Sequence, residues 1–300
     1  MRGSLRVCFV TSEFTPLAKT GGLGDVTSAL ARQLHATGHD IRVYLPSYAS
    51  LASQVRARGD RLIGILNGVD YREWNPEQDR FVPYPFSATD LRGKRRAKHA
   101  LLARLKLEPG PETALIGMVS RLVWQKGIDL LYGSLPRVLA ERDVCLVALG
   151  SGESPYEDFL ESLQRRHPQR VVFHRGYSEE LAHWIEAGSD LFLMPSRYEP
   201  CGLNQMYSLR YGTVPIVRRT GGLADSVQQW SPDARSGTGI LFDHLDSEAV
   251  YWAIVTALGL YRDRGAWITL MQNGMAQDFS WESQGERYVE AYSTLVGVGP

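Results

Sequence analysis

The chain has 300 residues, 44% of them hydrophobic and 22% charged, a composition typical of a globular protein with one large or two modest domains. Lysine and arginine total 33, as do aspartate and glutamate, so the charge balance favours neither a nucleic-acid nor an acidic-membrane partner. No run approaches the roughly 18 apolar residues of a membrane-spanning helix, and Leu5–Val10 is too short for the apolar core of a secretion sequence.

The first 48 residues follow the pattern of one βαβ unit. Leu5–Val10 is a compact apolar run that predicts a buried strand, and Ile41–Leu45 predicts a second one. Between them, Asp25–Ala36 places apolar residues at helical spacing, and Gly38 stands where glycine commonly ends a helix. This unit predicts the beginning of a doubly wound parallel sheet.

The pattern is interrupted before it resumes at Ala114. Ile63–Leu66 predicts a short strand that leads into the turn at Asn67-Gly68. Trp74-Asn75-Pro76 and the proline- and tyrosine-rich Phe81–Phe86 are typical of a loop, and Leu91–Leu105 predicts a basic helix.

From Ala114 onward, apolar runs alternate regularly with segments of helical spacing. The predicted strands are Leu115–Val119, Val144–Leu149, Val171–Phe173, Leu191–Met194, Val214–Val217 and Ile240–Phe242. The predicted helices are Gly127–Ala140, Tyr156–Arg166, Glu179–Ala187, Gly202–Tyr211 and Ser247–Leu260. This alternation predicts an α/β fold in which helices cover both faces of a parallel sheet.

The first glycine-rich loop, Lys19–Val26, lies between the first predicted strand and its helix. Gly21 and Gly22 let backbone N–H groups approach an anion, the helix N-terminus supplies a favourable dipole, and Lys19 adds a positive charge. A phosphate-binding loop and a plain βα turn fit this spacing about equally well. The loop is not the dinucleotide fingerprint, because Thr27 stands where that motif needs glycine or alanine.

Two further motifs follow predicted strands directly. In Ser120–Gly127, Arg121 and Lys126 are suited to binding a diphosphate. The alternative is that both are solvent-exposed cations of a surface loop. In Pro195–Leu203, Glu199 is suited to binding sugar hydroxyls or to balancing a developing positive charge. The alternative is that Glu199 is simply an acid at the N-terminus of a helix, where the helix dipole favours negative charge.

A second Gly-Gly turn, in Arg219–Asp225, follows the strand Val214–Val217 and offers backbone N–H groups to a phosphate or simply makes a tight turn. In open α/β sheets, ligands bind off the carboxyl ends of the strands, so four such loops in these places indicate one binding site.

The cysteines, Cys8, Cys145 and Cys201, lack the paired spacing of a disulfide framework or zinc site, which favours a cytoplasmic protein without a bound metal.

Taken together, these motifs resemble those of bacterial glycogen synthases and plant starch synthases. The segments that carry the resemblance are Lys19–Val26, Gly64–Asp70 with Trp74–Pro76, Ser120–Gly127, Pro195–Leu203 and Thr220–Leu223. The resemblance implies the GT-B fold, in which two Rossmann-like lobes face a cleft. It also implies transfer of glucose from ADP-glucose to the non-reducing end of an α-1,4-glucan, with retention and without a metal or other cofactor; UDP-glucose is the alternative donor.

The resemblance also implies a role for individual residues. Arg121 and Lys126 would neutralise the leaving diphosphate, and Glu199 would lie beside the transferred glucosyl ring. The mechanism it implies is a same-face displacement, in which the departing phosphate takes the proton of the acceptor. The other implied substrate-binding residues are Lys19, Gly21 and Gly22 of the first loop, Tyr207, and Thr220, Gly221 and Gly222 of the second Gly-Gly turn.

The chain departs from that family in its first lobe, because a Rossmann-like lobe needs on the order of 100–200 residues. We therefore expect a truncated first lobe over residues 1–60, a complete donor-binding lobe over residues 61–278, and a C-terminal helix over residues 279–300. The truncated lobe is expected to expose sheet edges and apolar surface. Two alternatives to an active enzyme remain: an inactive remnant that binds a sugar nucleotide, and a deletion product joined within Ala49–Arg58.

Overall fold

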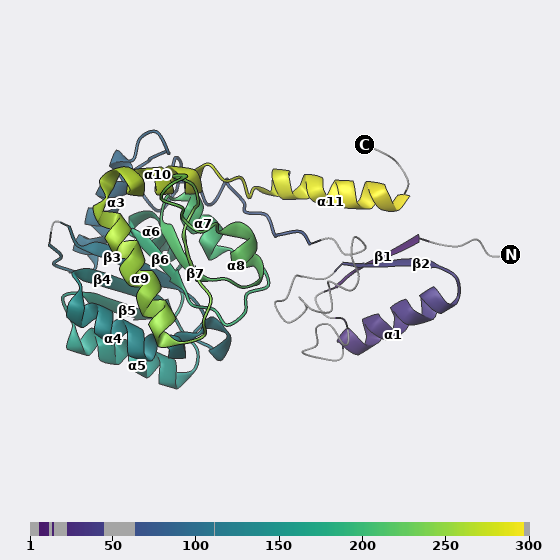
Figure 1. Cartoon of the computed structure of the whole chain (residues 1–300), viewed down its shortest axis with the longest axis horizontal. Coiled ribbons are helices and arrows are strands. Elements are labelled where there is room, and N and C mark those ends of the chain that lie inside the picture. Colours follow the sequence, from purple (N-terminus) through teal and green to yellow (C-terminus); the bar gives the residue numbers. More distant parts are fainter. Residues whose placement is uncertain (1–5, 12–13, 15–22, 45–63, 111, 297–300) are drawn as a thin grey trace. The chain divides into compact units, whose positions relative to one another are not determined.

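A computed structural model describes residues 6–11, 14, 23–44, 64–110 and 112–296, and these residues group into two compact units (Figure 1). Unit 1 comprises Met1–Gly68 together with Phe279–Pro300, and unit 2 comprises Val69–Asp278. Each unit is described by itself.

Unit 1 contains the predicted βαβ unit. Strand β1 (Arg6–Val10) pairs in parallel with β2 (Asp40–Tyr44), and helix α1 (Leu23–Ala36) connects them. Gly38 adopts a φ of +89° just after the helix, as expected for a residue that ends it. Val10 and Val26 are exposed among the described residues, and the expected truncation of this lobe stays a prediction.

The C-terminal helix of unit 1 is α11 (Trp281–Val296), and it packs on the segment that precedes unit 2. A Cβ on Gly68 would lie only 2.4 Å from the ring of Trp281, so glycine is needed for this close approach. The backbone carbonyl of Gly64 accepts a hydrogen bond from Arg287 at 3.1 Å. The prediction of a strand over Ile63–Leu66 is wrong for residues 64–66, where this carbonyl bonds a side chain of α11 instead of a neighbouring strand.

The described strands of unit 2 form a six-stranded parallel sheet in the order β5-β4-β3-β6-β7-β8. All seven residues of β4 are buried, as expected for a strand that is covered on both faces. The strands are β3 (Ala114–Val119), β4 (Val144–Gly150), β5 (Val171–Arg175), β6 (Leu191–Met194), β7 (Val214–Arg218) and β8 (Ile240–Phe242).

Helices cover the sheet of unit 2, with α4 packed against α9 and α6 packed against α3 and α7 (Figure 1). Three helices begin with the side-chain caps that their sequences favour, Ser178 before α6, Asp246 before α9 and Asp263 before α10. The helices are α3 (Arg92–Arg104), α4 (Leu131–Glu141), α5 (Ser154–Arg166), α6 (Glu179–Gly188), α7 (Asn204–Arg210), α8 (Gly221–Ser226), α9 (Ser247–Arg262) and α10 (Arg264–Met275).

Two helices begin later than the sequence pattern predicts. The predicted helix Gly127–Ala140 begins only at Leu131, as α4, because Ile128–Leu130 is a 3₁₀ turn; a second 3₁₀ turn, Trp124–Lys126, precedes Gly127. Gly127 lies between the turns with a φ of +68°, which interrupts a right-handed helix. Gly202 likewise has a φ of +74° and lies before α7 instead of within it.

Candidate functional site

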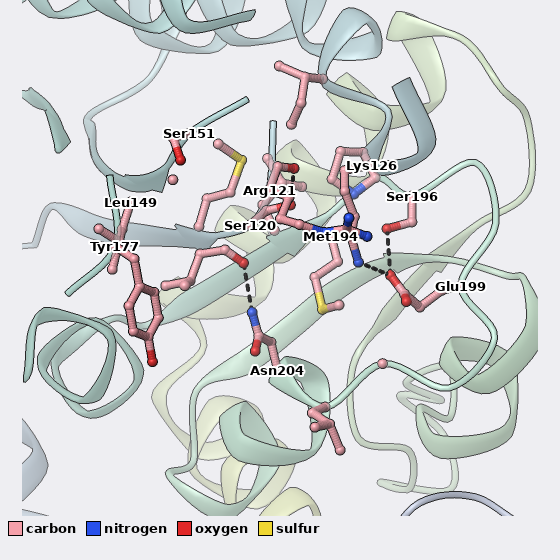
Figure 2. A pocket seen from close by; sticks show the side chains of 18 of the residues that line it. Ser120, Arg121, Lys126, Leu149, Ser151, Tyr177, Met194, Ser196, Glu199 and Asn204 are labelled. Carbon is pink, nitrogen blue, oxygen red and sulfur yellow. Dashed lines mark hydrogen bonds and ion pairs between the residues drawn. The ribbon is translucent and has the colours of Figure 1, made fainter. Parts of the chain in front are cut away.

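The candidate site lies where the strand order of unit 2 reverses. The chain proceeds from β3 outward through β4 and β5 on one side, and from β6 outward through β7 and β8 on the other. The loops that follow β3 and β6 therefore diverge and leave a crevice at the carboxyl ends of these strands. The crevice contains a pocket of about 450 Å³ whose lining includes Arg121, Lys126 and Glu199 (Figure 2).

Lys126 and Glu199 form an ion pair in this pocket. The Nζ of Lys126 lies 2.5 Å from Oε2 of Glu199, although the two residues are far apart in the sequence. The hydroxyl of Ser196 donates to the same carboxylate oxygen at 3.2 Å (Figure 2). The side chain of Glu199 is only 7% exposed, so these two donors compensate a carboxylate that is largely removed from water. Because both donors bond Oε2, Oε1 is the oxygen left to contact a ligand.

Contacts between the two loops fix the position of this ion pair. The backbone N–H of Arg197 donates to the carbonyl of Gln125 at 2.9 Å, and the side-chain amide of Gln125 donates to the carbonyl of Tyr198 at 3.2 Å. Arg197 also pairs with Asp129. At Gly127 the loops lie so close that a Cβ would be 2.1 Å from the carbonyl oxygen of Pro195. The site is thus held by the backbone as well as by side chains.

Tyr177 and Asn204 are among the pocket residues that the sequence motifs did not indicate. Tyr177 lines the pocket on the side opposite Glu199, and its side chain is exposed (Figure 2). Asn204, at the start of α7, donates to the carbonyl of Val119 at 2.7 Å and so holds the end of β3. Tyr177 follows β5 closely, so the rule that ligands bind after strands would have found it.

The second Gly-Gly turn lies at the start of α8 and contacts the backbone of Glu199. The N–H of Gly222 donates to the carbonyl of Glu199 at 3.0 Å, and a Cβ on Gly222 would lie 2.1 Å from the carbonyl oxygen of Cys201. The hydroxyl oxygen of Thr220 is buried without a hydrogen-bond partner in the part of the chain that the structure describes. The turn, including Gly221, therefore supports the loop that carries Glu199, and its predicted phosphate contact stays a prediction.

Tyr207 is placed by a stack of three aromatic rings. Trp74 lies between Tyr207 and His183, with ring centroids 3.9 Å and 3.8 Å apart, respectively. His183 and Tyr211 both contact the buried carboxylate of Asp79. Burial raises the pKa of Tyr207 to about 12. This stack attaches the segment after Val69 to α6 and α7, and the predicted substrate contact of Tyr207 stays a prediction.

Lys19, Gly21 and Gly22 lie outside the described residues. Among the residues that the structure places, no group of three or more His, Cys, Asp and Glu side chains is arranged to hold a metal ion. Within that same part of the chain, no helix is both long and apolar enough to cross a membrane.

Two family models match the chain. The model for glycosyl transferases group 1 matches residues 103–269, which contain the ion pair and most of the sheet of unit 2. The model for the starch synthase catalytic domain matches residues 6–81. The first match covers more than half of the chain.

Curated relatives and solved structures agree with these matches. The chain is 52% identical over 242 residues to the glycogen synthase of Thioalkalivibrio sulfidiphilus, covering 80% of this chain and 50% of that protein. It is also 52% identical to the glycogen synthase of Myxococcus xanthus, covering 81% of this chain and 50% of that protein. The chain thus spans about half the length of these relatives.

Among solved structures, the fold is similar to the catalytic domain of starch synthase IV from Arabidopsis thaliana bound to ADP and acarbose. The TM-score is 0.75 at 23% identity, over 98% of this chain and all of that one. HepE of Anabaena, in complex with UDP and glucose, has a TM-score of 0.65 at 17% identity, over 96% of this chain and 71% of that one. At these identities the likeness shows the fold, which is the predicted GT-B type.

Proposed function

The chain belongs to the glycosyl transferases group 1, and from this membership we propose that it acts as a retaining glucosyltransferase of the glycogen synthase type. The proposed reaction transfers glucose from ADP-glucose to the non-reducing end of an α-1,4-glucan in the cytoplasm. The observation that carries the proposal is the Lys126–Glu199 ion pair beside Arg121, in the crevice between β3 and β6.

The pocket supports one orientation of a sugar nucleotide. Arg121 and Lys126 supply positive charge for the diphosphate, and Glu199 supplies a carboxylate oxygen for the hydroxyls of the glucosyl ring. Tyr177 lies on the opposite side of the pocket, where its exposed ring is available to stack on the base (Figure 2). The donor would thus extend from Tyr177, through the two cations, to Glu199.

The same charges suit the proposed chemistry. A leaving nucleoside diphosphate gains negative charge as the bond to the sugar breaks, and fixed cations stabilise that charge. Lys126 would exchange part of its ion pair with Glu199 for contact with the phosphate, while Ser196 keeps its hydrogen bond to the carboxylate. Acceptor attack on the same face, with the proton passing to the departing phosphate, gives retention without a protein nucleophile.

Titration with nucleotides tests this proposal. Isothermal calorimetry of the chain with ADP, and separately with UDP, is expected to detect binding and to identify the preferred base. Arg121→Ala removes a charged contact worth about 1.5–3 kcal/mol, so the Kd for ADP should rise roughly ten- to a hundred-fold. Arg264→Ala is the matched control, because Arg264 is an exposed arginine on α10 that pairs with Glu112. Absence of nucleotide binding, or equal effects of both substitutions, would contradict the proposal.

A transfer assay separates an active enzyme from a binding remnant. The described residues before unit 2 form one short βαβ unit, and the chain spans about half the length of its glycogen synthase relatives, which favours the remnant as the second candidate. Incorporation of radiolabelled glucose from ADP-glucose into glycogen selects the enzyme. Nucleotide binding without incorporation selects the remnant.

A further inference from the structure

Two exposed aromatic side chains lie beside the Lys126–Glu199 ion pair. Trp124 is 54% exposed and Tyr198 is 39% exposed, and their ring centroids are 6.5 Å apart. Trp124 is on the 3₁₀ turn that ends at Lys126, and Tyr198 immediately precedes Glu199. We name this pair the aromatic ledge. Neither ring lines the pocket itself, but both stand on the loops that supply its ion pair, and large aromatic side chains left in water are typical of a binding surface.

The structure holds the ledge rigidly. The guanidinium of Arg197 lies 4.8 Å from the centroid of the Trp124 ring and covers one face of it. The backbone N–H of Trp124 donates to the carboxylate of Glu153 at 3.2 Å, and the backbone carbonyl of Tyr198 accepts from the side-chain amide of Gln125 at 3.2 Å. A preorganised ring loses little conformational entropy when a ligand stacks on its open face.

The cation that contacts the ledge is itself paired. Arg197, whose guanidinium lies over the Trp124 ring, forms an ion pair with Asp129. Aromatic rings that keep an exposed face suit an uncharged ligand with apolar faces. Sugar rings are such ligands, because their C–H groups carry partial positive charge and contact the negative face of an aromatic ring.

From this geometry we infer that the aromatic ledge binds the non-reducing end of the acceptor α-glucan. The inference rests on the proposed function, since it places the acceptor next to the glucosyl group at Glu199. Transfer requires the attacking hydroxyl to lie within about 3.5 Å of the reacting carbon, so the acceptor must pass close to Glu199. Trp124 and Tyr198 are the exposed rings on the two loops that hold that residue.

Maltoheptaose binding tests the inference, and it needs no turnover. The Kd for maltoheptaose is measured by calorimetry on the full chain, with and without saturating ADP. Trp124→Ala and Tyr198→Ala should each raise that Kd roughly five-fold or more, since one stacked ring contributes about 1 kcal/mol. Trp124→Phe keeps a ring and should bind within about two-fold of the wild type. Trp252→Ala is the matched control, because Trp252 is 52% exposed but lies on α9.

The outcomes separate this inference from the proposed function. If ADP binds and maltoheptaose does not, or if only Trp252→Ala weakens maltoheptaose binding, the ledge is not the acceptor surface and the nucleotide site stands. If maltoheptaose binding depends on Trp124 while ADP fails to bind, the ledge stands and the proposed donor is wrong. If Trp124→Ala instead dissociates a dimer on size-exclusion chromatography without affecting maltoheptaose, the ledge is a contact between copies of the chain and the inference is overturned.

Discussion

Replacing Gly127 by alanine tests whether close contact between the two loops is required to build the site. Gly127 has a φ of +68°, and a Cβ there would lie 2.1 Å from the carbonyl oxygen of Pro195 and 3.3 Å from a methyl group of Leu130. Ordinary contacts of a Cβ begin near 3.4 Å. The loops must therefore separate by about 1 Å or more, and the first bond affected is the one from Arg197 to Gln125.

The expected loss of stability follows from three contributions. A left-handed backbone costs an alanine about 1–2 kcal/mol, and forcing an extra methyl group into a packed site costs about 1–3 kcal/mol. Loss of one backbone hydrogen bond adds about 1 kcal/mol. We therefore expect Gly127→Ala to lower the free energy of unfolding by about 3–6 kcal/mol and to weaken ADP binding, because Lys126 moves with the loop.

Urea unfolding monitored by tryptophan fluorescence measures this effect, since six of the seven tryptophans lie in unit 2. Gly259→Ala is the matched control, because Gly259 lies within α9 and a Cβ there meets nothing within 4 Å. That control should raise stability by about 0.5–1 kcal/mol. A Gly127→Ala variant as stable as the wild type, with unchanged ADP affinity, would refute the requirement for close loop contact.

Two further substitutions test groups buried outside the pocket. Asp79→Ala should cost about 3–5 kcal/mol in urea unfolding, because Tyr211 and His183 both bond this buried carboxylate; a loss below about 1 kcal/mol would contradict that. Lys94 is buried, and desolvation lowers its pKa from 10.5 to about 7. Above pH 7 the unfolded chain therefore holds a proton that the folded chain has lost, so Lys94 makes stability rise with pH up to about 10.5. Relative to Lys94→Met, the wild type should gain about 2 kcal/mol between pH 7 and pH 9, and parallel stability curves would exclude this titration.

The predicted secondary structure was most accurate where burial on both faces leaves a continuous apolar run. The predicted strands Val144–Leu149 and Leu191–Met194 agree with β4 and β6 to within one residue. Helix starts were less accurate, because Gly127 and Gly202 fit a helical pattern in one dimension. Only the tertiary structure shows that Gly127 has a positive φ, which interrupts a helix, and that the carbonyl of Pro195 leaves no room for a Cβ there.

The sequence by itself determined the family, the α/β class and the charged residues of the pocket, because motifs that directly follow parallel strands meet at one edge of the sheet. Tertiary structure decided which groups touch. It paired Lys126 with Glu199, added Ser196 as a second donor, and placed Trp74 against Tyr207. These contacts join residues far apart in the chain, so they depend on strand order and loop geometry, which no local spacing records.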